Sequence, residues 1–205
     1  MSQQDTLFLS AEYFPSIAWY AHRLQADRVG IHTRESFVRS SLHNRCYITG
    51  PNGILMLSVP LLGGRSQRQS IQEVKISYAE DWRQHHWKSL QTCYRRTPYF
   101  EYYMAAFEAF YRQSYTYLLE LNRASIQLLD RCLSMHTSHP IDWSSDDEAL
   151  QAYGKVSHLR VPRERMPQHH FRYVQAFSDR HGFVNGLSTL DLLFCAGAKA
   201  LQPSV

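Results

Sequence analysis

Residues 7–32 read LFLSAEYFPSIAWYAHRLQADRVGIH, and this segment determines the class of fold. A short apolar run, Leu7–Ser10, has the composition of a buried strand. Pro15 stands just before a helical pattern over Ser16–Ala26, where its missing N–H costs little. Arg28–His32 suits a second strand. A strand, a helix and a strand at this spacing predict two parallel strands within an α/β sheet.

A β-hairpin is predicted next. Cys46–Gly50 and Ile54–Val59 flank Pro51–Gly53, and Asn-Gly between two apolar runs favours a tight turn. Ile71–Ser77 alternates and predicts a partly exposed strand. We therefore expect an α/β fold: a Rossmann-like, parallel-containing sheet with a β-hairpin, followed by a mainly helical second half. The length predicts a single domain over 1–205, sheet-rich over 1–77 and mainly helical over 78–205.

The helical half opens with Ser77-Tyr78-Ala79-Glu80, which has the S-x-x-E form of a capping box and predicts a helix over 79–95. One stripe of this helix is apolar but contains an imidazole. Its members are Trp82, His86, Leu90, Cys93 and Tyr94. Two interpretations of His86 stay open: a core histidine with its hydrogen bonds satisfied, or a titratable group facing a pocket.

Three further helices are predicted, over Tyr99–Tyr111, Ser114–Ser134 and Thr189–Ala196. Ser188 and Gly197 suit the two caps of the last one. Between them, residues 137–172 have weak periodicity and form a long irregular segment in this interpretation. Its basic residues Arg160 to Arg172 either close over an anion or belong to a solvated loop.

Composition narrows the class of protein. The 22 Lys and Arg against 18 Asp and Glu give a net charge of +4, too weak and unclustered to predict a nucleic-acid partner. Four cysteines lie far apart and predict reduced thiols. The amino terminus lacks the basic region of a signal peptide, and no apolar run is long enough to span a bilayer. We expect a cytoplasmic protein without a transmembrane segment; its oligomeric state does not follow from the sequence.

Cofactor and metal signatures are missing from the sequence. It contains no P-loop, G-x-G-x-x-G, H-E-x-x-H or G-x-S-x-G motif, so the cofactor stays unknown. The histidine pairs His85-His86 and His169-His170 are adjacent. Adjacent side chains on a helix diverge, so no metal site is predicted.

The candidate site residues come from several segments. Glu12, at the end of the first predicted strand, is a potential base or amine ligand, because ligands collect at the carboxyl ends of strands; a capping role is the alternative. A neutral His86 is a second candidate base. Asn44-Arg45 suits phosphate or carboxylate, or is an exposed polar pair. Asp191 is either a substrate ligand or part of the Ser188 cap. The aromatics expected to shape a pocket are Tyr13, Trp82 and Tyr94.

The order and spacing of seven motifs resemble the WbqC-like protein family over nearly the whole chain. The motifs are Glu12-x-Phe14-Pro15 with Trp19-Tyr20, Asn44-Arg45, Gly53 with Leu57-Ser58-Val59-Pro60, Trp82-x-x-x-His86-Trp87, Tyr94-x-x-x-Pro98-Tyr99-Phe100, Asp179-x-His181-Gly182-Phe183 and Leu187-Ser188-x-Leu190-Asp191-Leu192-Leu193-Phe194. The chain departs from the family pattern at Glu12, where glutamine is frequent.

The resemblance implies a function in bacterial surface-polysaccharide and O-antigen biosynthesis. It implies a transferase that attaches an amino acid such as glycine to the amine of a nucleotide-linked aminosugar. That sugar would be the small-molecule partner, and activation by ATP, an acyl carrier or aminoacyl-tRNA stays open. The alternative is a non-catalytic binding or scaffold protein of a polysaccharide biosynthesis cluster.

Overall fold

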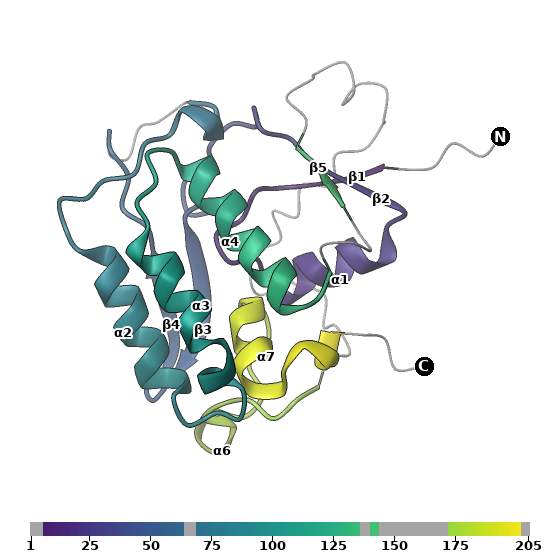
Figure 1. Cartoon of the computed structure of the whole chain (residues 1–205), viewed down its shortest axis with the longest axis vertical. Helices are drawn as coiled ribbons and strands as arrows, with labels where there is room; N and C mark the ends of the chain where they lie inside the picture. The colour runs from purple at the N-terminus through teal and green to yellow at the C-terminus, as the bar shows by residue number, and fades with distance from the viewer. Residues whose placement is uncertain (1–5, 64–68, 136–139, 144–171, 202–205) are drawn as a thin grey trace.

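The computed structural model describes residues 6–63, 69–135, 140–143 and 172–201. It has the predicted fold class: a parallel sheet and a β-hairpin, followed by a mainly helical half. In Figure 1 the parallel sheet lies to one side, and the hairpin with α2 (Trp82–Tyr94) and α3 (Phe100–Arg112) lies to the other. Between them lie α4 (Leu118–Cys132) and α7 (Thr189–Ala196). Helix α7 contacts α3, α4, α1 (Ile17–Gln25) and β3 (Arg45–Gly50), so it joins the two sides.

The parallel sheet has the order β1-β2-β5, with β2 in the middle. β1 is Thr6–Leu9 and β2 is Arg28–Ile31, and they pair with Phe8 opposite Gly30. Helix α1, Ile17–Gln25, connects them and is capped by the Ser16 side chain, as the strand–helix–strand pattern predicts. β5, Ile141–Asp142, lies within the segment predicted to be irregular.

The hairpin is formed by β3, Arg45–Gly50, and β4, Gly53–Ser58, which pair in antiparallel register from Arg45–Ser58 to Gly50–Gly53. Gly53 has φ of 102°, which a glycine adopts without strain. The hairpin prediction is confirmed. The predicted strand over Ile71–Ser77 is wrong. A 3₁₀ turn, η2 at Ile71–Glu73, is followed by isolated bridges, because the chain turns here to bury Ile71, Val74 and Ile76 against α4.

Helix α2 is Trp82–Tyr94, and its buried residues are the five of the predicted stripe. Its N-cap is Asp81, whose carboxylate accepts the Gln84 N–H at 3.3 Å, so the expected cap at Ser77 is wrong. The helix ends before Thr97-Pro98, as predicted.

The remaining helices are α3, Phe100–Arg112; α4, Leu118–Cys132; α6, Ser178–His181; α7, Thr189–Ala196; and a final 3₁₀ turn, η4, Ala198–Leu201. α7 has the predicted bounds and caps. Phe194 on α7 packs against the rings of Tyr94, Phe100 and Phe107, which joins three helices in one aromatic core. The basic residues Arg160, Arg163 and Arg165 lie outside the described residues.

Candidate functional site

Glu12 lies just beyond the carboxyl end of β1, where the chain turns toward α1. Its side chain is buried, with 2% exposure, and its Oε2 accepts the Ser16 N–H at 3.2 Å. Burial, which penalises the charged form, raises the pKa of Glu12 to about 8, and the negative charge of Glu35 adds to the rise. Glu12 has no ion-pair partner among the described residues.

A second carboxylate, Glu35, follows β2 at the same edge of the sheet. Its Oε1 accepts the Ala11 N–H and lies 3.2 Å from Nε2 of His43, and its Oε2 accepts the Ser10 hydroxyl at 3.0 Å. Burial alone would raise the pKa of Glu35, but the hydrogen bond and charge of His43, with the bonds from Ser10 and Ala11, lower it overall. Two neighbouring carboxylates thus have pKa values shifted in opposite directions, a pattern typical of acid–base sites.

Arg45, at the start of β3, lines the same crevice as Glu12. Its Nε is buried and has no hydrogen-bond partner in the described part of the chain, and the same holds for Oδ1 of Asn44. The crevice has no room for a water-sized sphere. Unpaired buried polar atoms are rare in proteins and call for an explanation. A ligand that brings acceptors to Arg45 and donors to Asn44 would supply one.

The turn that carries Glu12 is held by the segment before α7. Phe14 has φ of 43°, a left-handed conformation that strains a non-glycine residue. Its carbonyl accepts the Ser188 hydroxyl at 2.8 Å, and the Pro15 carbonyl accepts the Thr189 N–H at 2.9 Å. Ser188 and Gly186 also line the crevice. Residues distant in sequence therefore fix the turn and close the crevice.

His86 lies in a different cluster, beneath this turn. Its Nδ1 is 3.0 Å from the Tyr13 hydroxyl, which is also 3.0 Å from the Tyr111 hydroxyl. Trp82 packs edge-on against the His86 ring. Burial lowers the pKa of His86 to about 4, although its hydrogen bond to the Ser58 backbone acts in the opposite direction. The imidazole is therefore neutral near pH 7 and is hydrogen-bonded to the Tyr13 hydroxyl and to the Ser58 backbone.

Asp191 lies in a third cluster, at the first turn of α7. Its Oδ1 accepts the hydroxyls of Thr49 and Tyr94 at 2.7 and 2.6 Å, and its Oδ2 accepts the Tyr173 hydroxyl at 2.6 Å. Burial raises the pKa of Asp191, while the three hydroxyl donors lower it and offset part of that rise. The Ser188 N–H bonds to the Tyr47 carbonyl, so Asp191 does not complete a capping box as one interpretation held.

The structure therefore divides the predicted site residues among three places. Glu12 and Arg45 share a crevice. Asn44 precedes Arg45 in the chain but does not line this crevice, and its amide donates to the Val59 carbonyl. Tyr13, Trp82 and His86 form the second cluster, and Tyr94 and Asp191 the third. Sequence reasoning missed Glu35 and His43. A signal for Glu35 existed, because the rule that selected Glu12 at the end of the first strand applies equally to the residues after the second strand.

Within the described residues, no group of three or more His, Cys, Asp or Glu side chains is placed to hold a metal ion. Among the helices described, none is both long and apolar enough to cross a membrane.

Comparison with known proteins places these residues in a family. Searches of curated proteins and of solved structures gave no match. The model of the WbqC-like protein family matches residues 11–161, which include Glu12, Glu35, Asn44, Arg45 and His86. Because this match covers well over half of the chain, the protein belongs to the WbqC-like protein family.

Proposed function

We propose that this protein is a cytoplasmic transferase of surface-polysaccharide or O-antigen biosynthesis that forms an amide between an amino acid such as glycine and the amine of a nucleotide-linked aminosugar. The observation that carries the proposal is the pair of buried carboxylates Glu12 and Glu35, with pKa values shifted in opposite directions, together with the crevice that Glu12 shares with Arg45. Because the pKa of Glu12 is about 8, its ionised carboxylate is a strong enough base to take the proton released when an amine attacks.

In the proposed step, the amine of the sugar attacks the carbonyl carbon of an activated aminoacyl donor. The C–N bond forms, the bond to the donor's leaving group breaks, and Glu12 accepts the proton released from nitrogen. Arg45 holds a carboxylate or phosphate of the substrate through its planar guanidinium, and Asn44 adds a neutral hydrogen bond. The negative charge of Glu35 helps to raise the pKa of Glu12, which makes the ionised Glu12 carboxylate a stronger base.

In this proposal the other predicted residues do not touch the substrate but hold the site in place. His86 positions Tyr13, which is adjacent to Glu12 in the chain, and Trp82 packs against both rings. Tyr94 and Asp191 anchor α7 to β3 through Thr49, and thereby support the residues that precede α7. Because the crevice is closed in the structure, substrate entry requires its wall of Gly186 and Ser188 to move.

Glu12→Gln tests the assignment of the base. The amide keeps the shape and can still accept the Ser16 N–H, but it cannot take a proton. Turnover, measured by mass spectrometry as addition of one glycyl residue to a nucleotide-linked aminosugar, should fall by about 10²- to 10⁴-fold. In the wild type, turnover should rise with pH and level off above about 8, where Glu12 is ionised.

The exposed Glu101→Gln on α3 is the matched control and should leave turnover unchanged. A neutral carboxyl group resembles an amide, and glutamine is frequent at this position in the pattern of the family. Full activity of Glu12→Gln would therefore contradict the base role and make Glu12 a neutral hydrogen-bonding group.

A non-catalytic scaffold is the second candidate function, and strand β4 is the observation that favours it. Three consecutive apolar residues, Ile54, Leu55 and Met56, are 39%, 38% and 44% exposed. Contiguous exposed apolar surface is typical of protein–protein contacts. Replacing Leu55 and Met56 with serine should abolish partner binding, and leave turnover intact, if the two functions are separate.

A further inference from the structure

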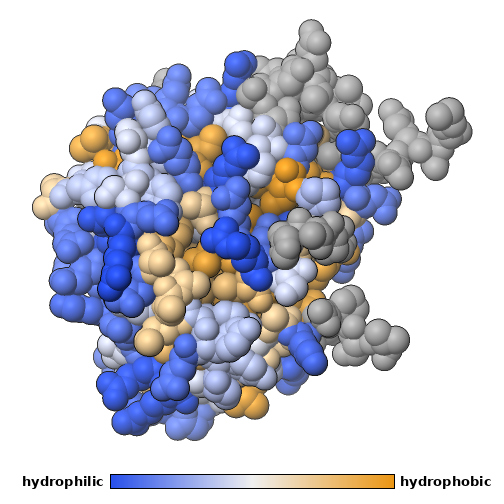
Figure 2. Space-filling view, in the orientation of Figure 1, coloured by the Kyte–Doolittle hydropathy of each residue, from blue (hydrophilic) through white to orange (hydrophobic). Residues whose placement is uncertain are grey.

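A groove between α4 and β5 is unused by the proposed chemistry. Its volume is about 790 Å³, within the range of about 300–1,000 Å³ typical of small-molecule sites. Ile126 and Ile141 form apolar walls, and the polar lining includes three arginines and one aspartate. Figure 2 shows apolar surface beside strongly hydrophilic residues where Figure 1 places α4 and β5.

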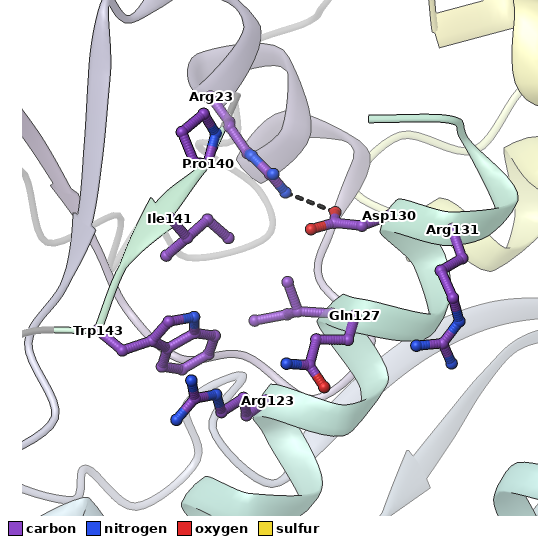
Figure 3. A pocket seen from close by; sticks show the side chains of 9 residues that line it. Arg23, Arg123, Gln127, Asp130, Arg131, Pro140, Ile141 and Trp143 are labelled. Atoms are coloured by element: carbon purple, nitrogen blue, oxygen red, sulfur yellow. Dashed lines mark hydrogen bonds and ion pairs between the residues drawn. The ribbon is translucent and has the colours of Figure 1, made fainter. Parts of the chain in front are cut away.

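One end of the groove combines a cation with an aromatic plane. The Arg123 guanidinium lies over the Trp143 ring, 5.1 Å from its centroid, and Figure 3 shows both at the same end with Gln127 beside them. Arg123 is exposed and Trp143 is half-buried. In the described part of the chain, Arg123 has no carboxylate partner. Its planar fork is therefore available for a phosphate, and a planar group can contact the Trp143 ring where Arg123 does not cover it.

At the opposite end of the groove, the positive charge of Arg23 is neutralised by Asp130. Arg23 donates to Oδ1 of Asp130 at 2.5 Å, and Tyr20 donates to the same oxygen at 2.9 Å. Figure 3 shows this ion pair across the groove from Trp143. Arg131 adds positive charge at the rim. The uncompensated positive charge therefore lies at the Trp143 end and along the α4 rim.

This charged end adjoins the candidate site. Trp143 directly follows β5, so it lies at the same carboxyl edge of the parallel sheet from which Glu12 departs. Asn122, next to Arg123 on α4, donates to the carbonyls of Ala11 and His43 at 2.8 Å each. A ligand in the groove would therefore have its charged end beside the segments that carry Glu12 and His43.

We propose that the α4–β5 groove binds the nucleoside diphosphate part of the substrate, with the base against Trp143 and a phosphate on Arg123. This inference rests on the proposed function for the sugar that the nucleotide carries, but the binding itself does not require catalysis. The apolar walls suit the ribose and the base edge, and the arginines suit the diphosphate.

Calorimetric titration of the full chain with UDP, ADP, GDP and CDP tests the inference. At least one should bind, and its affinity should weaken as salt is raised. Arg123→Ala and Trp143→Ala should each weaken binding by about tenfold or more. Trp143→Phe should recover most of the loss, because it restores an aromatic plane. Arg96→Ala, an exposed arginine beyond α2 with the same change of charge, should bind as the wild type does.

The inference is overturned if none of the four nucleotides binds, or if Arg123→Ala and Arg96→Ala bind equally well. A short RNA that binds more tightly than any mononucleotide would also overturn it. Its failure can be told apart from that of the proposed function. Nucleotide binding that Arg123→Ala weakens, without any amide product, upholds the groove and refutes the transferase. Amide formation with an unchanged KM in Arg123→Ala would uphold the transferase and refute nucleotide binding in the groove.

Discussion

The polar groups around Asp191 and those around Glu12 are similarly buried, but they differ in how fully they are paired. Asp191 uses both oxygens to accept three hydroxyl donors, and each of those donors comes from a different part of the chain. At the crevice, Glu12 accepts the Ser16 N–H and a hydrogen bond from the Ser16 side chain, whereas Arg45 Nε and Asn44 Oδ1 have no partner in the described part of the chain.

The difference in hydrogen-bond pairing distinguishes polar groups that stabilise the fold from polar groups that could bind a ligand. A fully paired buried network rigidifies the structure, and removing a member leaves the others unsatisfied. Unpaired buried groups contribute no such stability, so their retention needs another reason. We therefore interpret the Asp191 and His86 clusters as structural support, and the crevice as the place that the proposed reaction would use.

Asp191→Leu should give the largest change in stability, because it leaves the hydroxyls of Thr49, Tyr94 and Tyr173 without an acceptor. We expect a loss of about 3–5 kcal/mol in the free energy of unfolding, measured by urea denaturation. Asp179→Leu, at an exposed position on α6, should change it by about 0.5 kcal/mol or less. Equal effects of the two substitutions would remove the distinction between the two regions.

The pH dependence of the free energy of unfolding tests whether Glu12 is buried in its neutral form, unlike the fully paired Asp191. Its pKa is about 8 in the folded protein and near 4.5 when unfolded, so unfolding releases a proton between these values. Stability contributed by the neutral carboxyl group is therefore lost as pH rises from about 5 to about 8. Glutamine does not titrate, so Glu12→Gln should not show this loss and should be more stable than the wild type at pH 8 by about 4 kcal/mol. Parallel pH profiles for the two proteins would contradict the raised pKa.

Tyr13→Phe should give the smallest effect of the three, because it removes one hydroxyl but keeps the ring packed against Phe14 and Trp82. Loss of the bonds to His86 and Tyr111 should cost about 1–2 kcal/mol in the free energy of unfolding. Tyr102→Phe, whose ring is 81% exposed, is the control. If Tyr13→Phe instead abolished turnover at unchanged stability, the His86 cluster would belong to the reaction and not to its support.

Local patterns in the sequence were sufficient to predict most of the helices and strands of the fold. The stripe of α2, the bounds of α7 and the Asn-Gly hairpin follow from helical periodicity, cap residues and turn chemistry, which act over a few residues. β5 could not be predicted in this way. It has two residues, too few for any periodicity, and it is a strand only because β2 offers it a partner.

The candidate site was predictable only in part. The position at the end of β1 made Glu12 a candidate, and residue type made Arg45 one; the structure brings these two residues to one crevice. Which candidates meet depends on long-range contacts: Tyr13 is adjacent to Glu12, yet its hydroxyl reaches His86 and Tyr111. The partners of Asp191 come from three separate segments. An argument about helix caps considers only neighbouring residues, so it could not predict that Asp191 accepts three hydrogen bonds.

The bond between Ser188 and the strained turn at Phe14 joins residues 174 positions apart. During synthesis, the Glu12 turn therefore emerges from the ribosome long before the segment that holds it. Contacts of such separation form late in folding, after the loop-closure entropy has been overcome. A chain interrupted before residue 188 would carry Glu12, Glu35 and Arg45 but lack the crevice wall.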